Sequence, residues 1–257
     1  MSSNDFISDK KLKKIDRQLS EIISRTGLDR KTQDEVFDKT TLLTFDKLIS
    51  DKIIDYLDFP ISTGKEGNVF RGVTKDKRFV AVKIYRTNTS TFKHILQYID
   101  GDPRFQSIRK TRRDIVYAWT QKEYKNLERA HRINLNVPKP IKFIKNVLVL
   151  EYIGDKNTPA PLMKDVTLSN PKKTFDEIIK IMGKLYKKAD LVHGDMSAFN
   201  FLYFKNKIYL IDLGQAVLLD HPNSDEFLRR DIKNILTYFK KYKINKDENK
   251  IYKLITA

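Results

Sequence analysis

The sequence predicts an α+β protein of two lobes: an N-terminal lobe with an antiparallel sheet and a helix, and a C-terminal lobe that is mainly helical. Short apolar runs of strand length stand at 59–85 and 146–154, whereas apolar residues at helical spacing dominate after residue 171. A proline-containing linker at 156–161 separates the two patterns. We therefore expect a charged extension at 1–41, an N-terminal lobe at 42–154 and a C-terminal lobe at 155–257.

Apolar residues of the charged extension recur at helical spacing, at Leu12, Ile15, Leu19 and Ile22. This pattern predicts an amphipathic helix that either docks on the main body or on a partner, or frays as terminal segments often do. The run TLLTFDKLI at 41–49 predicts a second, short helix.

Three short strands with tight connections are expected between Phe59 and Tyr85. Side chains alternate between the two faces of a strand, so Lys83 shares a face of the last strand with Ala81 and opposes Val82. Burying an unpaired ammonium is costly, so a lysine among these apolar residues needs a reason. Lys83 is therefore a candidate functional residue.

A helix is expected from Asp114 to Arg132, with Asp114 as its N-cap. One face of this helix is an apolar stripe in which Glu123 stands alone as a charged residue; the stripe consists of Val116, Trp119, Leu127 and Ala130. We interpret Trp119 as a core residue.

The C-terminal lobe begins after a buried strand at 146–154. A helix is expected to start near Pro171, with Thr174 and Glu177 forming a capping box. A loop at 191–200, a strand at 207–212 and a helix from Asp225 to about Tyr242 follow.

Composition excludes several classes of site. The chain has no cysteine, so disulfides, thiolate nucleophiles and zinc–thiolate sites are excluded, and four histidines are too few for a histidine-rich metal site. No apolar run approaches the roughly 20 residues that span a bilayer, and the N-terminus lacks a secretory signal. We expect a soluble, cytoplasmic protein that does not associate with membranes.

The most informative segment is His193-Gly194-Asp195, followed by Asn200 and, after a short strand, by Asp212. Phosphoryl transfer needs metal ions that hold the phosphates and a carboxylate that orients or deprotonates the nucleophile. Carboxylate and amide oxygens are hard ligands suited to Mg²⁺. One small volume could therefore hold a complete phosphoryl-transfer site.

These residues resemble the motifs of protein kinases. The spacing from Asp195 to Asn200 equals that of the kinase catalytic loop, and Asp212-Leu213-Gly214 stands where kinases carry Asp-Phe-Gly. Val80-Ala81-Val82-Lys83 is similar to the kinase Val-Ala-Ile-Lys strand, and Glu123 falls on the next helix, where its ion-pair partner is expected. The resemblance implies a two-lobed protein-kinase-like fold.

The resemblance is closer to the RIO family of atypical protein kinases. Residues 62–66 (STGKE) are similar to the nucleotide loop of that family, and the similarity continues through 81–87, 119–127, 159–162 and 220–231. The Lys-Ile-Tyr-Arg-Thr segment at 83–87 and the long loop after it resemble the type-one RIO subfamily. The resemblance implies an ATP-dependent, autophosphorylating serine kinase with ATPase activity that acts in maturation of the small ribosomal subunit.

The same resemblance implies residue roles. Asp195 would orient or deprotonate the nucleophile, and Asn200 and Asp212 would ligate Mg²⁺ or Mn²⁺, with Asp212 also a possible phosphoaspartate. ATP would be bound by the remaining predicted residues: the phosphate-loop residues Ser62, Gly64 and Lys65, the phosphate-binding Lys83 with its brace Glu123, and the adenine-facing Glu151 and Ile153. His193 is interpreted as a structural residue of the loop.

Departures from the kinase pattern keep other functions open. No Ala-Pro-Glu motif follows Asp212, so peptide docking by the usual platform is not expected and the protein substrate is unknown. Gly67 stands where the RIO family usually has alanine, which predicts a looser loop. The alternatives are a ribosome-assembly ATPase switch with little transfer to other proteins, and a small-molecule kinase of the aminoglycoside or sugar type, against which residues 62–66 argue.

The net charge of +17 has two interpretations, attraction to polyanions or a solvated, lysine-rich surface. The first favours a pre-ribosomal small-subunit particle or rRNA as partner. The segment 86–113 is expected to be a long, mobile basic connection, and it binds RNA or is simply solvated. Its arginines favour phosphate binding: Arg86, Arg104, Arg109, Arg112 and Arg113.

Overall fold

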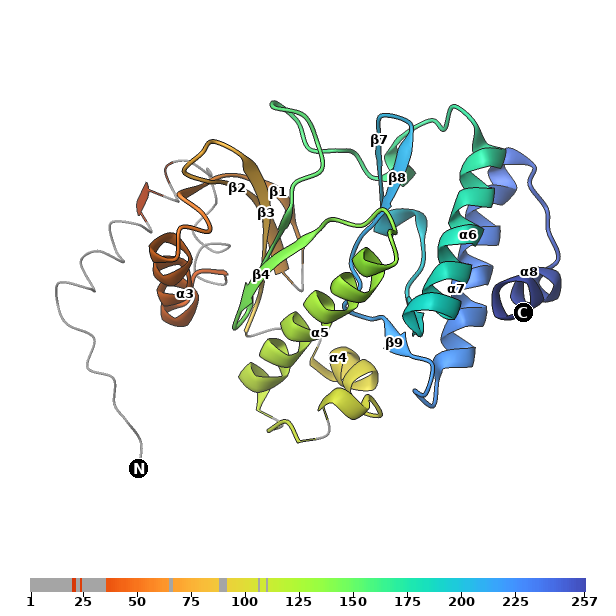
Figure 1. Cartoon of the computed structure of the whole chain (residues 1–257), viewed down its shortest axis with the longest axis horizontal. Coiled ribbons are helices and arrows are strands. Elements are labelled where there is room, and N and C mark those ends of the chain that lie inside the picture. The colour runs from red at the N-terminus through yellow and green to blue at the C-terminus, as the bar shows by residue number, and fades with distance from the viewer. Residues whose placement is uncertain are drawn as a thin grey trace.

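A five-stranded antiparallel sheet with the strand order β1-β2-β3-β5-β4 forms the N-terminal lobe (Figure 1). Its strands are Tyr56–Thr63 (β1), Gly67–Val73 (β2), Phe79–Tyr85 (β3), Pro140–Ile144 (β4) and Val147–Glu151 (β5). The computed structural model describes residues 20–21, 24, 36–64, 67–87, 92–105, 107–109 and 111–257. The helix predicted around Leu12 to Ile22 lies outside these residues in all four of its apolar positions.

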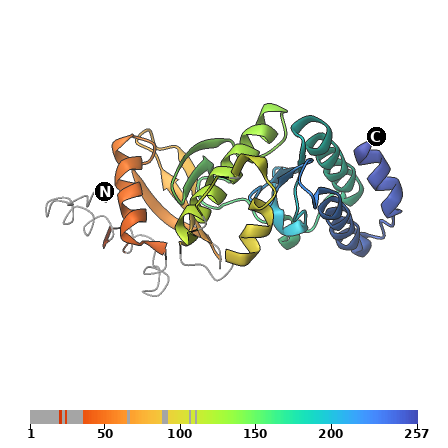
Figure 2. The ribbon, with the colours of Figure 1, turned by 90° about the horizontal axis from the view of Figure 1, so that it is seen from below.

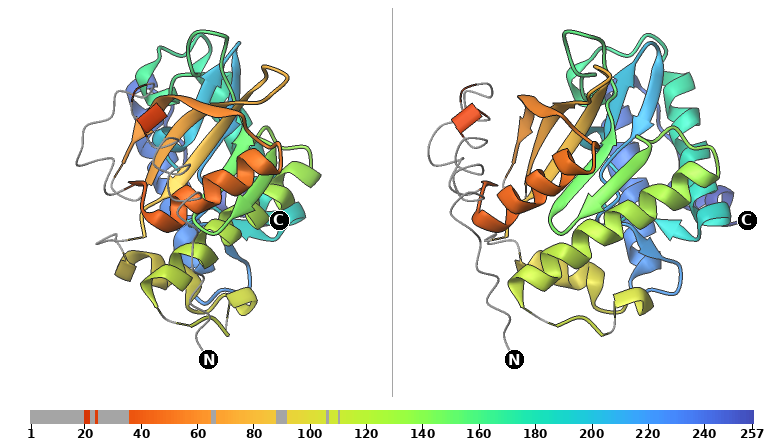
Figure 3. Two further views of the ribbon diagram at one scale, coloured as in Figure 1. Left: turned by 90° about the vertical axis from the view of Figure 1, so that its left-hand side faces the viewer. Right: turned by 60° about the vertical axis from the view of Figure 1, so that its left-hand side comes forward.

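The two faces of this sheet are covered by different helices (Figure 3). Helix α3 (Lys39–Ser50) packs Phe45 and Leu48 against Val82 and its neighbours on one face. Helix α5 (Arg112–Arg132) covers the other face, where Leu148 joins a core cluster with Trp119. Alternation along β3 therefore directs the side chain of Lys83 towards α5.

Helix α3 begins where its sequence allows a cap. The carboxylate of Asp38 accepts a hydrogen bond from the Thr41 amide at 2.7 Å and another from the Thr87 hydroxyl at 3.0 Å. The N-cap thus satisfies one free amide of the helix and ties its start to the residues after β3. Val36 and Phe37, just before this cap, are buried in the same cluster as α3.

Helix α5 begins earlier than its sequence suggested. Asp114 was expected to be the N-cap, but Thr111 takes that position, and Asp114 lies in the first turn. The Thr111 hydroxyl accepts from the Asp114 amide at 3.2 Å and donates to the Asp114 carboxylate at 2.7 Å. The acidic side chain therefore complements the cap and the helix dipole.

The segment 86–113, predicted to be a long mobile connection, contains an unpredicted helix. Helix α4 (Phe92–Ile99) buries Ile95, Tyr98 and Ile99, and the turn η1 (Pro103–Phe105) buries Phe105. Seen from below, α4 and α5 lie between the sheet and the C-terminal helices (Figure 2). This part of the chain belongs to the core that joins the lobes.

The C-terminal lobe consists of three packed helices and two small ladders. The helices are α6 (Pro171–Ala189), α7 (Ser224–Phe239) and α8 (Glu248–Thr256); the ladders pair β6 (Leu191–Val192) with β9 (Val217–Leu218), and β7 (Phe201–Phe204) with β8 (Lys207–Leu210). The capping box predicted for Thr174 and Glu177 is wrong. Asn170 caps α6 instead, because Pro171 occupies its first turn and the Thr174 hydroxyl donates to the Asn170 carbonyl inside the helix.

The fold class predicted from the sequence is confirmed: the protein is α+β with a sheet lobe and a helical lobe. Among the described residues, no helix is both long and apolar enough to cross a membrane.

A matched pair of leucines measures how much the packing of α3 contributes to stability. We expect Leu48→Ala to lower the free energy of unfolding by about 3 kcal/mol, because Leu48 is fully buried between α3 and the sheet. Leu254→Ala on α8 should change it by less than about 0.5 kcal/mol, because that side chain is 61% exposed. Urea unfolding of both variants tests this, and equal effects would contradict the packing described for α3.

Candidate active site

Lys83 lies at the junction of the two lobes. Its ammonium nitrogen is 3.0 Å from both carboxylate oxygens of Glu123 and 3.0 Å from Oδ1 of Asp212. Burial alone would lower the pKa of Lys83, but the charges of Asp212 and Glu123 raise the pKa well above its usual value. The lysine is therefore permanently charged, and its cost of burial is offset by two carboxylates.

Hydrogen bonds to Asp231 of helix α7 hold the loop that carries Asp195. The buried carboxylate of Asp231 accepts hydrogen bonds from the amides of Gly194 and Met196 at 2.8 and 2.7 Å. Burial raises the pKa of Asp231 to about 7, because those two hydrogen bonds and Arg230 lower it by less. Gly194 has a φ of +78°, and a Cβ there would lie 2.9 Å from the Gln215 carbonyl oxygen, so the turn requires glycine.

Asn200 folds back on Asp195. Its amide nitrogen donates to the Asp195 carbonyl at 2.7 Å and to the Asp195 carboxylate at 3.1 Å. Burial raises the pKa of Asp195, while His193 and the Asn200 hydrogen bond act in the opposite direction. Since the amide nitrogen of Asn200 is used in this way, its oxygen is the atom suited to ligate a cation.

The β7–β8 hairpin brings Asp212 beside Asn200. The amide of Ile211 donates to the Asn200 carbonyl at 2.9 Å, and the buried His193 ring contacts the Ile211 carbonyl at 3.2 Å. His193 is thus a structural residue of the loop, as predicted. Asp212 itself has a φ of +59°, which is unusual for a residue other than glycine. Desolvation raises the pKa of Asp212, but Lys83 lowers it by more, so the group is ionised.

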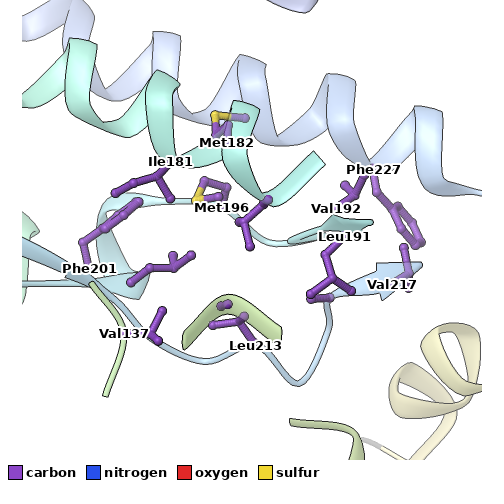
Figure 4. Close-up of a cluster of buried hydrophobic side chains, with 14 of the residues drawn as sticks. Val137, Ile181, Met182, Leu191, Val192, Met196, Phe201, Leu213, Val217 and Phe227 are labelled. Atoms are coloured by element: carbon purple, nitrogen blue, oxygen red, sulfur yellow. The ribbon is translucent and has the colours of Figure 1, made fainter. Parts of the chain in front are cut away.

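Apolar neighbours anchor both aspartates. Met196 follows Asp195 and Leu213 follows Asp212, and both apolar side chains are buried in one cluster with Ile181 of α6 (Figure 4). Each acid is therefore fixed by the residue next to it in the sequence. The segments that carry Asp195 and Asp212, which the β7–β8 hairpin separates in the sequence, therefore pack on the same apolar cluster.

The phosphate loop is partly described. Ser62 is the second-last residue of β1 and pairs with Val69, and the Gly64 amide donates to the Gly67 carbonyl at 3.0 Å. Lys65 lies outside the described residues. A Cβ at Gly67 would lie 2.5 Å from the Ile84 carbonyl oxygen, so close packing against β3 requires glycine there. The looser loop stays a prediction, because residues 65–66 lie outside the described part of the chain.

The strand between the lobes ends at the predicted adenine site. The Glu151 amide donates to the Lys139 carbonyl at 2.8 Å, and the Ile153 carbonyl accepts from the Ala160 amide at 2.9 Å. The prediction assigns main-chain groups of these two residues to adenine, and the hydrogen bonds place both residues in the connection between the lobes. The Glu151 side chain is exposed and turns back to the Lys139 amide.

The donor set of Asn200 and Asp212 fits a hard divalent cation. Both offer oxygen atoms, and Mg²⁺ in phosphoryl-transfer sites uses one or two carboxylates together with waters and substrate phosphates. Within the described part of the chain, no three histidine, aspartate or glutamate side chains gather as a metal cluster. A cation at these two residues would therefore take its other ligands from water and from a bound nucleotide.

Sequence reasoning missed the residues of α5 that support the loop after Asp212. Lys122 and Asn126 are fully buried and donate to main-chain carbonyls of residues 213–216. Burial lowers the pKa of Lys122 to about 7. The signal in the sequence was a lysine and an asparagine on the inner side of a helix, but their acceptors are backbone atoms that a sequence does not display.

Two arginines of the basic segment are engaged within the protein. Arg104 forms an ion pair with Asp102 at 2.7 Å and donates to Asn126 at 2.8 Å, and Arg86 contacts Asn68 at 3.4 Å. Arg104, whose side chain is only 14% exposed, is therefore used within the fold and is neither solvated nor free to bind a phosphate. Arg109, Arg112 and Arg113 are exposed.

A sheet lobe and a helical lobe that meet at a lysine, its two carboxylates and an Asp–Asn loop define a protein-kinase-like enzyme. The model of the RIO domain matches residues 68–251 of the chain. This chain belongs to the RIO family of atypical protein kinases, within its type-one subfamily, and is a RIO-type serine/threonine-protein kinase. Membership implies ATP and a divalent metal as cofactors.

The relatives agree with this assignment over most of their length. The RIO-type serine/threonine-protein kinase Rio1 of Haloferax volcanii is 42% identical over 227 residues, which cover 88% of this chain and 78% of the relative. The protein of the same name from Methanocaldococcus jannaschii is 38% identical and covers 99% and 88%. The Rio2 kinase of Chaetomium thermophilum, solved as an ADP/Mg²⁺–phosphoaspartate complex, has the same fold, with a TM-score of 0.66 at 19% identity over 84% of this chain and 66% of that one.

Two glycine substitutions test how closely α5 packs on the loop after Asp212. A Cβ at Gly214 would lie 3.0 Å from the buried ring of Trp119, so Gly214→Ala should destabilise the protein by about 1–3 kcal/mol. In Gly183→Ala, within α6, the new methyl group meets no atom within 4 Å, and the better helix propensity should stabilise the protein by about 0.5–1 kcal/mol. Thermal or urea unfolding measures both; stabilisation by Gly214→Ala would show that this contact is loose.

Proposed function

We propose that this protein is an ATP-dependent serine kinase that autophosphorylates and hydrolyses ATP, and that it acts in the cytoplasm in maturation of the small ribosomal subunit. The observation that carries the proposal is the continuity of the site. Lys83 contacts Asp212, and Asp212 stands beside the hydrogen-bonded pair of Asp195 and Asn200. A permanently charged cation, two candidate metal ligands and a candidate base thus occupy one region between the lobes.

Each group has a role that its chemistry supports. Lys83 binds the α and β phosphates of ATP, since Glu123 holds its ammonium in place. Asn200 and Asp212 ligate Mg²⁺ or Mn²⁺. A bound divalent cation would neutralise charge on the phosphate oxygens. Ser62, Gly64 and Lys65 enclose the phosphates, and the main chain of Glu151 and Ile153 binds adenine.

The transfer itself requires one proton acceptor. An oxygen of the nucleophile bonds to the γ-phosphorus while the bond from phosphorus to the bridging oxygen breaks, and ADP leaves with that electron pair. The carboxylate of Asp195 receives the proton of the nucleophile. The raised pKa of Asp195 brings it closer to the range in which a carboxylate works as a base.

The short connection after Asp212 favours ATP hydrolysis as a principal activity. From Asp212 the chain passes through β9 and reaches α7 at Ser224, so residues 213–223 form the whole segment. This leaves little chain for a peptide-docking platform. The phosphoaspartate in the crystals of the related Rio2 kinase supports Asp212 as a transient acceptor. On that route the ionised Asp212 carboxylate, which has no proton to lose, displaces ADP from the γ-phosphorus. Water then gives a proton to Asp195 and attacks the same phosphorus, which releases phosphate and the free Asp212 carboxylate.

A basic surface of the C-terminal lobe supports an RNA-containing partner. A hollow of about 750 Å³ lies between the first turns of α6 and the β7–β8 turn, away from the predicted site. Its rim carries Lys172, Lys173, Lys180, Lys205 and Lys207, together with Asp176 and Glu177. Lysine ammonium groups suit phosphate backbones, and the net charge of +17 acts in the same direction.

Replacing the proposed base separates catalysis from binding. We expect Asp195→Asn to lower ADP formation at least about 100-fold while the affinity for ATP changes less than about threefold, because the carboxylate acts on the nucleophile. Asp220→Asn, at an exposed aspartate, is the matched control and should retain full activity. Coupled-enzyme assays and calorimetry give the two quantities; near-normal turnover in Asp195→Asn would remove that residue from catalysis.

The destination of the phosphate distinguishes the candidate activities. We expect labelled ATP with Mg²⁺ to yield free phosphate together with a small fraction of phosphoserine or phosphoaspartate on the protein, as resolved by intact-mass and peptide mass spectrometry. Small-subunit RNA particles should stimulate phosphate release, with binding that weakens steeply with salt. Phosphorylation of an added sugar or aminoglycoside, with no labelled protein, would instead support a small-molecule kinase.

A further inference from the structure

Two buried side chains of α5 hold the loop that follows Asp212. The Lys122 ammonium donates to the Gly214 carbonyl at 2.9 Å and also to the Ala216 carbonyl. The Asn126 amide donates to the Leu213 and Ala216 carbonyls at 2.9 and 2.8 Å. Three main-chain oxygens within four residues are thus bound by two side chains one helical turn apart.

Burying an ammonium and an amide lowers the stability of the fold relative to apolar side chains at the same positions. Both side chains are fully buried, and Asp102, whose charge acts on Lys122, is ion-paired with Arg104. A polar group in the interior must be compensated, and apolar side chains of similar volume would fill such a space at lower cost. We explain the presence of these two polar groups by their hydrogen bonds, which fix the conformation of the loop after Asp212.

The loop needs such support because Asp212 is strained. Its φ of +59° lies in the left-handed region, which is unfavourable for a residue with a Cβ. If the carbonyls after Asp212 were released, the backbone could relax towards an ordinary conformation. The carboxylate would then turn away from Lys83 and Asn200.

Arg104 and Asp102 fix the orientation of the Asn126 side-chain amide. Arg104 donates to the Asn126 side-chain oxygen at 2.8 Å, so the nitrogen of that amide must face the loop. Arg104 is in turn held by the buried Asp102, through contacts of 2.9 Å from Nε and 2.7 Å from Nη2. Asp102, Arg104 and Asn126 therefore form a chain of hydrogen bonds from the turn after α4 to the loop after Asp212.

We propose that Lys122 and Asn126 are positioning residues that keep Asp212 directed towards its cation, and that Arg104 keeps Asn126 in the orientation this requires. The proposal rests on the proposed role of Asp212 as a metal ligand. Because Glu123 lies on the same helix and binds Lys83, α5 sets both the phosphate-binding lysine and the metal-binding aspartate. A displacement of α5 would disturb both groups together.

The test measures metal-dependent nucleotide binding, without turnover. ADP affinity is determined by calorimetry over a range of Mg²⁺ concentrations for wild type, Asn126→Leu and Lys122→Met. Both variants should need about tenfold more Mg²⁺ for half of the metal-dependent gain in affinity, with ADP affinity in EDTA unchanged. Lys125→Met makes the same substitution on the same helix and should leave the Mg²⁺ requirement unchanged.

The outcomes separate this proposal from the proposed function. If Asp212→Asn abolishes the gain from Mg²⁺ while Asn126→Leu and Lys122→Met keep the wild-type requirement, the positioning roles are wrong and Asp212 remains a ligand. If Asp212→Asn has no effect, the metal assignment itself fails. A purely structural role would lower the melting temperature without changing the Mg²⁺ requirement.

If Asn126→Leu and Lys122→Met do not fold, Arg104→Met, a less disruptive variant, still tests the proposal. Arg104→Met leaves Lys122 and Asn126 in place and removes only the hydrogen bond that orients the Asn126 amide. We expect a shift of about threefold in the Mg²⁺ requirement, in the same direction and smaller than that of Asn126→Leu. Its absence in a folded Arg104→Met protein would overturn the role given to Arg104, and wild-type behaviour of every folded variant would overturn the whole proposal.

Discussion

The contact of one ammonium group with two carboxylates connects the lobes of this protein. Lys83 belongs to the central strand of the sheet, Glu123 to the helix beneath it, and Asp212 to the C-terminal lobe. Removing one partner of a buried ion pair leaves an uncompensated charge, which commonly costs about 3–5 kcal/mol. The relative placement of sheet, helix and metal loop is therefore tied to a single electrostatic balance.

The precision of the site comes from apolar and main-chain contacts as much as from charge. Met196 and Leu213 are buried beside the two aspartates, and Asp231 accepts hydrogen bonds from the amides on either side of Asp195. Interiors are packed densely, so small displacements of such anchors are resisted. Asp195 and Asp212, which are adjacent in sequence to these buried residues, are therefore held in fixed positions.

Much of the site could be predicted because its parts stand in short, ordered motifs. Lys83 within a strand, the spacing of Asp195 and Asn200, and Asp212 after a second strand indicated the fold, and the structure brings these four side chains together. The two lobes followed from the change of hydrophobic period near residue 160.

The remaining features depend on contacts that no local pattern displays. Helix α4 is short and lies in a basic, polar stretch, and its burial of Tyr98 depends on Trp119 and Phe227 from elsewhere in the chain. The caps at Thr111 and Asn170 lie three and four residues before the predicted positions, because several residues in each segment could serve as caps. The roles of Lys122 and Asn126 require knowledge of which carbonyls face α5.

The ion pair of Lys83 with Asp212 has a thermodynamic consequence. A phosphate that approaches Lys83 competes with Asp212 for the ammonium, and a cation that approaches Asp212 competes with Lys83 for the carboxylate. Either ligand weakens the internal contact that opposes the other, so their affinities are coupled, and by reciprocity each must favour the other equally. An enzyme built in this way discriminates against a nucleotide that arrives without its metal.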